Sequence, residues 1–462
     1  MGKLIFVSSD SHAGMPKDQW AEYLDPRFHD LLPSLRHDNT MYPVAVHFLG
    51  AQVGGTSGLD EVRDAHASGY GGLHDAQLRL DAMDLDGVAA EMIFHGDGRL
   101  GDLFHNSTNR AYPIDAWQAG AEAWNRWAAD NFSIAPERFL VVAAIGPCTD
   151  MAAAVADVHR NADRGFVGTY CPGYMRPDDM VPLWDPYWDP FWSACEERDL
   201  AVVVHAGYGW EQGIAFSHFE RIYRDAVETF ETEDPEVLLA QSSGIKVESF
   251  EFFKEFATSV RPRRPLLQLL LGGVFDRHPR LKLVLTEIRG DWIPATLRHL
   301  DAVHEAHRDE LPAERRPSEY WSTNCLFGAS FIHRAEVAMR HEIGVETISF
   351  GRDYPHPEGT WPNTREWLGD AFRGVPVDEA RLMLGENAIR LLGLDRAPLA
   401  AIAERIGLEI DEVVDFRGVV RPEAVENFAS RGGYLREPEN DTRVTELDPL
   451  IREDIESIAA AR

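Results

Sequence analysis

The stretch "LAVVVHAG" (residues 200–207) is the clearest candidate β-strand of this chain, an apolar run that ends in a histidine. Seven more apolar or β-branched runs follow the same plan, each leading through a loop to a helical pattern. They are "LIFVSS" (4–9), "GVAAEMIF" (87–94), "FLVVAAIG" (139–146), "GFVGTYC" (165–171), "LKLVLTE" (281–287), "YWSTNCLF" (320–327) and "ETISFG" (346–351). Apolar strands that alternate with amphipathic helices indicate a parallel sheet. The count of eight predicts an α/β protein with a (β/α)8 barrel.

The segments between these strands set the expected domain organisation. Helices are expected at 115–130, 149–162, 189–199, 291–307 and 331–342. Long insertions follow the first strand (13–86) and the fifth (208–265), and such insertions lie at the C-terminal face of a barrel, where they build a substrate pocket or a subunit contact. We expect residues 1–395 to form the barrel and residues 396–462 to form a helical extension that packs on it or on a second subunit.

Composition excludes several classes of protein. The 462 residues include 45 Lys plus Arg against 76 Asp plus Glu, a formal charge of −31 that disfavours nucleic acid and anionic membranes as partners. No apolar run reaches the roughly 18 residues of a membrane span, and the first residues are too short a run for a signal peptide. The four cysteines form no CxxC pair, which argues against a zinc ribbon and a disulfide framework. We expect reduced thiols and a cytoplasmic protein.

Ionisable side chains stand where candidate strands end. Asp10 and His12 follow the first strand, and His205, Glu287 and Asp353 follow the fifth, sixth and eighth. Parallel barrel strands open at one mouth, so these residues are expected to converge there. Two imidazoles with carboxylates form a donor set that suits Zn²⁺, Mn²⁺ or Fe²⁺.

Each of these residues also has an ordinary structural explanation. Asp10 could cap a helix, and its partner could be an arginine or solvent. Asp353 could be a turn residue, and Glu287 could form a surface ion pair with Arg289. Only the coincidence of four strand ends favours a joint site.

The ordered motifs resemble those of the amidohydrolase superfamily, in the branch that holds aminocarboxymuconate-semialdehyde decarboxylase and benzoate-type decarboxylases. They are "DSHAG" (10–14), "RLDAMDLDGVAAEMIF" (79–94), "WDPFWSACEERDLAVVVHAG" (188–207), "LLGGVFDRHPRLKLVLTE" (270–287), "DWIP" (291–294) and "FGRDYPHPEGTWPN" (350–363). The resemblance implies a barrel with one divalent metal, Zn²⁺ by preference, with Mn²⁺ or Fe²⁺ as alternatives. It implies Asp10, His12, His205 and Asp353 as ligands, and family habit favours a homodimer.

Two departures from the family shape the expected chemistry. The first motif is Asp-x-His, where the decarboxylases have His-x-His or Glu-x-His, and Glu287 replaces a common histidine. A carboxylate at that position suits a base for metal-activated water, either as a ligand itself or beside the ion. We therefore expect a hydrolase of a small organic substrate such as an amide, an enamide or a ring-cleavage product.

The expected catalytic roles follow from that reading. Asp353 or Glu287 would take a proton from water, and His356 or Arg289 would stabilise an oxyanion, although His356 could equally be structural. The alternative is a decarboxylase or hydratase of a small aromatic or unsaturated acid, with Arg289 or Arg352 holding the substrate carboxylate. A catalytically inactive barrel that serves as a binding subunit is a third hypothesis, which the intact set of mouth residues disfavours.

Overall fold

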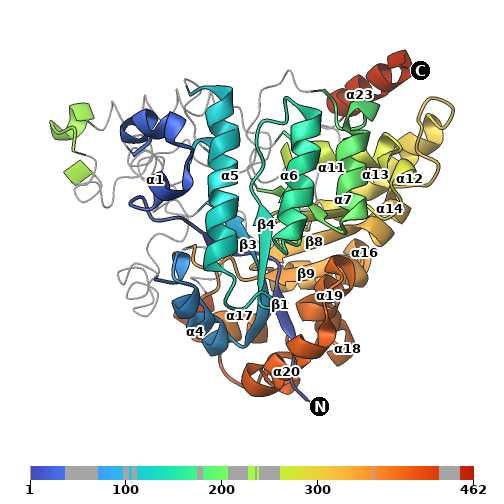
Figure 1. The fold of residues 1–462 in the computed structure, drawn as a ribbon. Coiled ribbons are helices and arrows are strands. Elements are labelled where there is room, and N and C mark those ends of the chain that lie inside the picture. Colours follow the sequence, from blue (N-terminus) through green and yellow to red (C-terminus); the bar gives the residue numbers. More distant parts are fainter. Residues whose placement is uncertain are drawn as a thin grey trace.

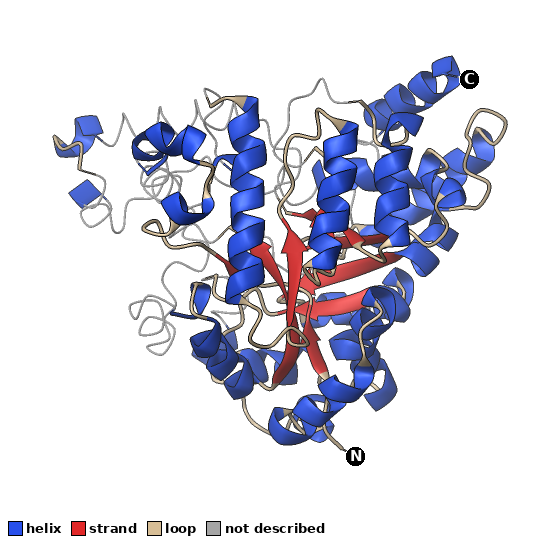
Figure 2. Cartoon of the chain, viewed as in Figure 1, coloured by secondary structure: helices blue, strands red, loops and turns tan. Residues whose placement is uncertain are grey.

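A nearly closed barrel of parallel strands forms the centre of the molecule (Figures 1 and 2). The computed structural model describes residues 2–36, 71–96, 103–106, 112–173, 181–206, 227–234, 237–238, 261–356, 359–425 and 448–461. The strands are β1 Phe6–Ser8, β2 His12–Ala13, β3 Val88–His95, β4 Phe139–Ala143, β5 Gly168–Tyr170, β6 Ala201–His205, β7 Lys282–Thr286, β8 Cys325–Ser330 and β9 Ile348–Gly351. They pair in the order β1-β3-β4-β5-β6-β7-β8-β9, and β2 also pairs with β3.

The first and last strands come together to close the ring. β2 continues the line of β1 after three residues, so the two act as one barrel strand beside β3. On the other side, the Ser9 amide donates to the Phe350 carbonyl at 3.0 Å, and the Asp353 amide donates to the Asp10 carbonyl at 3.0 Å. The predicted (β/α)8 barrel is thereby confirmed.

Helices surround the strands on the outside of the ring (Figure 2). The α-helices are α1 Trp20–Tyr23, α4 Ala76–Asp86, α5 Ile114–Asn131, α6 Met151–Asp163, α7 Asp189–Glu197, α11 Arg261–Leu271, α12 Val274–Arg277, α13 Ile293–Ala306, α14 Pro317–Asn324, α15 Arg334–Ala338, α16 Arg340–Ile343, α17 Thr364–Ala371, α18 Val377–Arg381, α19 Asn387–Leu392, α20 Arg396–Ile406, α21 Ile410–Val414 and α23 Asp448–Ala461. Short 3-10 helices lie at η1 Pro26–Leu31, η2 Gly71–Leu73, η3 Phe104–Asn106, η4 Pro186–Trp188 and η6 Val345–Thr347, and a π-helix lies at η7 Leu382–Glu386. Among the described residues, no helix is long and apolar enough to cross a membrane.

The strands are apolar on both faces because both faces are buried. In β6, Val202 and Val204 pack in the core between the strands and the helices, whereas Ala201 and Val203 pack in a second core inside the ring. His205 continues the inward-facing series, so its place at the end of β6 puts it at the mouth. All four cysteines are buried and free, as expected.

Local signals fix the unit that leads into β3. The Asp75 side chain accepts hydrogen bonds from the amides of Gln77 and Leu78, which caps the start of α4. Gly87 ends the helix with a φ of 74°, a left-handed conformation that costs glycine little, and β3 begins at the next residue. This α4–β3 unit carries Arg79, Asp86 and Glu91.

One strand prediction is wrong at its start. Residues 320–327 do not begin as a strand, because α14 occupies Pro317–Asn324 and β8 begins only at Cys325. Pro317 suits the first turn of a helix, and the Glu319 side chain accepts from the Arg316 amide at 2.9 Å, so this end of α14 is capped. The apolar side chains of Tyr320 and Trp321 are buried on the helix and do not mark a strand.

The insertions and the C-terminal segment are described in part. The insertion 13–86 contains α1, η1, η2 and α4, but its residues 37–70 lie outside the described residues, as does most of 208–265. After residue 395, α20 packs beside the start of the chain and α23 packs on α11 (Figure 1). The division of the chain at residue 395 stays a prediction.

Candidate metal centre

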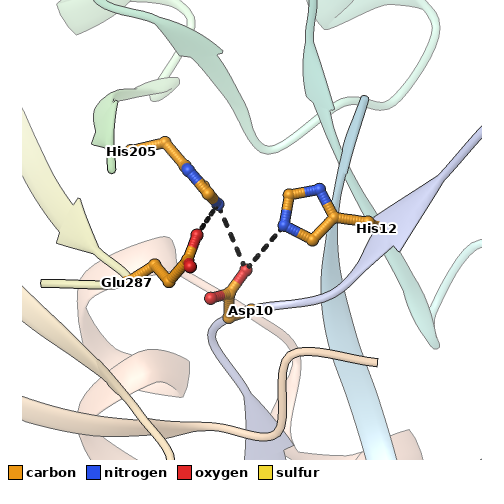
Figure 3. Close-up of side chains that lie close together, drawn as sticks. All are labelled: Asp10, His12, His205 and Glu287. Carbon is orange, nitrogen blue, oxygen red and sulfur yellow. Dashed lines mark ion pairs between the residues drawn. The ribbon is translucent and has the colours of Figure 1, made fainter. Parts of the chain in front are cut away.

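Six side chains gather where the strands end, and we call them the mouth cluster: Asp10, His12, His205, Glu287, Asp353 and His356. Asp10 lies between β1 and β2, His12 begins β2, and His205 ends β6. Glu287 follows β7, and Asp353 and His356 follow β9. Figure 3 shows the carboxylates of Asp10 and Glu287 at the same end of the His205 ring, with His12 facing Asp10.

The imidazole nitrogens of the cluster face carboxylate oxygens at closely similar distances. His12 Nε2 lies 3.6 Å from Asp10 Oδ1 and 3.5 Å from Asp353 Oδ1. His205 Nε2 lies 3.5 Å from Asp10 Oδ1 and 3.4 Å from Glu287 Oε2. These spacings exceed ordinary hydrogen bonds between charged groups, which are about 2.7–2.9 Å long. They match the roughly 3.4 Å that separates two ligands of a tetrahedral ion with bonds of about 2.1 Å.

Backbone carbonyls orient both histidines. His12 Nδ1 is 3.2 Å from the His95 carbonyl, and His205 Nδ1 is 3.1 Å from the Ala206 carbonyl. A carbonyl only accepts, so each Nδ1 carries the proton and donates, which leaves the lone pair of each Nε2 directed into the cluster. This is the arrangement that metal-binding histidines adopt.

The electrostatics of the cluster favour a cation between the rings. Burial, together with the imidazoles of His356 and His205, lowers the pKa of His12 well below its usual value of 6.5. Burial opposes protonation of His205 too, but the nearby Asp10 carboxylate, together with the charge of Glu287, raises the pKa of His205 overall. A carboxylate field that favours a proton on one ring also favours a metal ion.

Two of the carboxylates stand on unusual backbone. Glu287 has a φ of 53° and Asp353 a φ of 51°, values in the left-handed region that residues with a Cβ rarely adopt. Such conformations cost on the order of 1–3 kcal/mol each and persist where the surroundings hold them. Here they turn two carboxylates to the mouth at the ends of β7 and β9.

The residues present fit a divalent metal ion. Asp10 Oδ1, His12 Nε2 and His205 Nε2 are buried and have no hydrogen-bond partner among the described residues. Ligand atoms of Asp10, His12, His205 and Glu287 all lie within 4.8 Å of one another, as do those of His12, Asp353 and His356. Buried imidazole nitrogen and carboxylate oxygen without hydrogen bonds are the donors that an ion satisfies.

The structure places the remaining candidates differently. His356 folds back to the cluster: its ring stacks on His12 with centroids 4.0 Å apart, and its Nδ1 lies 3.3 Å from Asp353 Oδ1. Arg289 makes a two-pronged ion pair with Asp291, with Nε 2.9 Å from Oδ1, so part of its guanidinium is already engaged. Its role at an oxyanion stays a prediction.

Arg352 does not fit the role of holding a substrate carboxylate. Its side chain is fully buried and lies between Glu91 and Asp86, with Nη2 2.7 Å from Glu91 Oε2 and Nη1 2.8 Å from Asp86 Oδ2. These two carboxylates occupy the guanidinium that a substrate would need. That prediction is therefore wrong.

Several residues around the mouth cluster were not predicted from the sequence. The Ser330 hydroxyl donates to Asp10 Oδ2, and Arg79 Nη1 donates to the His12 carbonyl at 2.7 Å. Glu91 lies in the middle of the buried strand β3 and pairs with both Arg79 and Arg352. A signal for Glu91 was present, because an acid inside the apolar run "GVAAEMIF" must find a cation when it is buried.

Comparisons with known proteins find similar proteins that are named decarboxylases and amidohydrolases. It is similar to a γ-resorcylate decarboxylase from a Rhizobium species, with 28% identity over 284 residues that cover 58% of this chain and 74% of the relative. An amidohydrolase from Mycobacterium avium subsp. paratuberculosis shares the fold at 18% identity, covering 85% of this chain and 100% of that one, with a TM-score of 0.57. A 5-carboxyvanillate decarboxylase from Novosphingobium aromaticivorans, complexed with manganese, does so at 17% identity, covering 85% and 97%, with a TM-score of 0.54.

The prediction of a hydrolase is wrong, because the curated relatives are named decarboxylases. That prediction depended on Glu287 as a base for water. In the structure, Glu287 Oε2 lies 3.4 Å from His205 Nε2, inside the group of metal-ligand candidates. A carboxylate in that position is compatible with either reaction, so it cannot distinguish attack by water from loss of CO2.

The family itself follows from a match over most of the barrel. A family model described as amidohydrolase matches residues 63–394. These residues include β3 to β9, and with them four of the six residues of the mouth cluster. The chain therefore belongs to the amidohydrolase family, as its ordered motifs predicted.

Proposed function

We propose that this protein is a divalent-metal-dependent decarboxylase that acts on a small aromatic carboxylic acid. The observation that carries the proposal is the mouth cluster, whose buried donor atoms are spaced like the ligands of one ion. The curated relatives named γ-resorcylate decarboxylase support this reaction class for the site.

Asp10, His12, His205 and Asp353 would hold the ion, with Glu287 as a further ligand or as a neighbour of the site. A divalent cation held by these residues would act as a Lewis acid toward the substrate carboxylate. This would explain how the chain can hold a carboxylate although Arg352 is engaged with Glu91 and Asp86. Zn²⁺ stays a prediction beside Mn²⁺ and Fe²⁺, and the manganese in the 5-carboxyvanillate decarboxylase supports Mn²⁺ as the first ion to test.

Loss of CO2 requires a proton at the ring carbon, since the carbon–carboxylate bond breaks and a carbon–hydrogen bond replaces it. Asp353 is the proposed carrier of that proton. Its Oδ1 lies between His12 Nε2 at 3.5 Å and His356 Nδ1 at 3.3 Å, and its backbone conformation aims it into the mouth. His356, which is about one-fifth exposed, would return a proton from solvent to Asp353.

The test is an assay of purified protein, loaded with Mn²⁺, on γ-resorcylate, 5-carboxyvanillate, an unsaturated carboxylic acid and a panel of amides. We expect CO2 release from at least one phenolic acid and a loss of about 10²–10⁴-fold in Asp353→Asn. Amide turnover without CO2 would contradict the proposal, and so would CO2 release that survives in Asp353→Asn. Hydration of an unsaturated acid without CO2 would instead support a hydratase.

A further inference from the structure

A second group of charged side chains is buried directly beside the mouth cluster. It consists of Arg79 and Asp86 on α4, Glu91 on β3 and Arg352 after β9, and we call it the arginine–carboxylate network. Arg79, Glu91 and Arg352 are 0% exposed and Asp86 is 7% exposed. No step of the proposed reaction uses them.

Glu91 joins the two arginines. Arg79 Nε donates to Glu91 Oε1 at 2.6 Å, and Arg352 Nε donates to Glu91 Oε2 at 2.9 Å. Arg352 Nη1 also donates to Asp86 Oδ2 at 2.8 Å, and Thr364 donates to the same oxygen at 2.8 Å. The arginines hold the pKa of Glu91 below its usual value against the effect of burial, so the carboxylate stays ionised.

Stability alone is a poor reason to bury such a network. Removing charges from water costs several kcal/mol per ion, and well-packed apolar side chains of similar volume often serve as well or better. A buried arginine can, however, hold neighbouring groups in fixed positions, because its planar guanidinium donates hydrogen bonds in set directions.

The network holds the backbone that carries three of the proposed metal ligands. Arg79 Nη1 donates to the His12 carbonyl at 2.7 Å. Arg352 directly precedes Asp353, and its amide donates to Ser8 Oγ at 3.0 Å. Ser8 Oγ in turn donates to the Asp10 carbonyl at 2.9 Å. One connected set of contacts thus reaches His12, Asp10 and Asp353.

Tyr354 contacts both arginines of the network and the backbone of His12. Its ring faces both guanidinium groups, with centroid distances of 5.2 Å to Arg79 and 4.6 Å to Arg352. Its carbonyl accepts from the His12 amide at 2.6 Å. The Tyr354 hydroxyl packs closely against the backbone at Gly72, because a Cβ added at Gly72 would lie 2.4 Å from this hydroxyl.

We propose that the arginine–carboxylate network is a positioning device that sets the separation of Asp10, His12 and Asp353, and thereby the metal affinity of the mouth. Glu91 is its central positioning residue, because its carboxylate accepts hydrogen bonds from both arginines. The proposal rests on the metal site of the proposed function and deepens it. It assigns the α4–β3 unit a role in holding an ion that none of its side chains touches.

The test compares Glu91→Gln with Val158→Ala. Gln keeps the shape of Glu91 but removes the charge, whereas Val158 is a buried residue of α6 whose truncation lowers stability away from the ligand strands. Mn²⁺ affinity is measured by competition with a chelator, and the melting temperature of the metal-free protein is measured beside it. We expect Glu91→Gln to weaken Mn²⁺ binding by about 10–100-fold, the range found for outer partners of metal ligands. Val158→Ala should bind Mn²⁺ within about twofold of wild type.

Arg79→Lys keeps the experiment decisive if Glu91→Gln fails to fold. Lysine preserves the charge but cannot bridge Glu91 and the His12 carbonyl with a planar fork, so a loss of about tenfold is expected. Wild-type affinity in a folded Glu91→Gln, or in Arg79→Lys, would overturn the proposal, as would an equal loss in Val158→Ala. Wild-type protein that binds Mn²⁺ but releases no CO2 would overturn the proposed function while leaving this inference standing.

Discussion

The mouth cluster and the arginine–carboxylate network are two buried charged groups that lie side by side and are built on opposite principles. In the network, donor and acceptor atoms approach to between 2.6 Å and 2.9 Å, and two arginines face two carboxylates. In the mouth cluster, imidazole nitrogens face carboxylate oxygens at 3.3–3.6 Å. The charges of the first group are paired with one another by short contacts, whereas the second group is spaced for one more atom.

The contrast follows from the basic side chain that faces the carboxylates in each group. Arginine neutralises a carboxylate permanently and fixes its position, which suits a scaffold. Imidazole offers a lone pair that a metal ion can share, which suits a binding site. A cation should therefore affect the two groups very differently, and so should loss of a single side chain.

The largest effect is expected for His205→Ala. Because this change removes a lone pair from the centre of the mouth cluster, metal content should fall to near zero and decarboxylation by about 10³-fold or more. His299→Ala is the matched control, since the half-buried His299 of α13 pairs with Asp448 of α23 and belongs to neither group. Metal analysis and turnover are measured on both variants. Full metal content in His205→Ala would contradict the claim that the mouth cluster, unlike the arginine–carboxylate network, is a metal site.

Metal removal should lower the melting temperature. An ion present at about 1,000 times its Kd stabilises the folded state by about 4 kcal/mol. Thermal unfolding with and without excess chelator measures this effect. The same comparison in Glu91→Gln should show a smaller shift, because that variant binds the ion less tightly. Unchanged melting of the wild type in chelator would contradict a metal at the mouth.

A smaller effect is expected at Glu287. Glu287→Gln removes the charge that faces His205 and should weaken metal binding or turnover by about 10–100-fold. Glu287→His offers an imidazole nitrogen as a metal donor in place of the carboxylate oxygen and should recover part of the loss. Titration of the wild type, Glu287→Gln and Glu287→His with Mn²⁺ measures these changes in affinity. If Gln and Glu bind the ion equally, Glu287 belongs to neither the ligand set nor its support.

The smallest effect concerns a buried carboxyl outside both groups, that of Asp454 in α23, which has the Gln268 amide as a hydrogen-bond partner and the Arg264 guanidinium nearby. Burial, opposed by Arg264 and by the hydrogen bond from Gln268, raises the pKa of Asp454 to about 6. The folded protein therefore binds this proton more tightly than the unfolded chain, so stability falls as the pH rises from about 4 to about 6 and is then level.

The corresponding experiment is thermal unfolding of Asp454→Asn against wild type. The variant should be more stable by about 1–3 kcal/mol at pH 8, and its advantage should vanish toward pH 4. An advantage that stays constant across this range would show that Asp454 does not titrate there.

Much of the site could be predicted because a parallel barrel brings strand ends together. Asp10, His12, His205 and Glu287 each end an apolar run, and their ligand atoms lie within one 4.8 Å group. Asp353 joins them through His12, and His356 reaches the site only because the turn after β9 folds back. The cytoplasmic location and the homodimer stay predictions.

What could not be predicted depends on contacts between distant side chains. The positive charge of Arg352 suits a residue that binds a substrate carboxylate. Only the fold shows that this charge is already paired with Glu91 and Asp86. Residues 320–327 have strand-like side chains, yet capping at Arg316 and Glu319 makes their first half a helix. The reaction could not be inferred from Glu287, because a carboxylate beside an ion serves more than one chemistry.

The most direct test of the account is a calorimetric titration of metal-free protein with Mn²⁺. We expect one ion to bind per chain in the wild type, and no saturable binding in the double variant His12→Ala with His205→Ala. A wild-type chain that binds no ion, or a double variant that binds as the wild type does, would contradict the claim that the mouth cluster is a metal site.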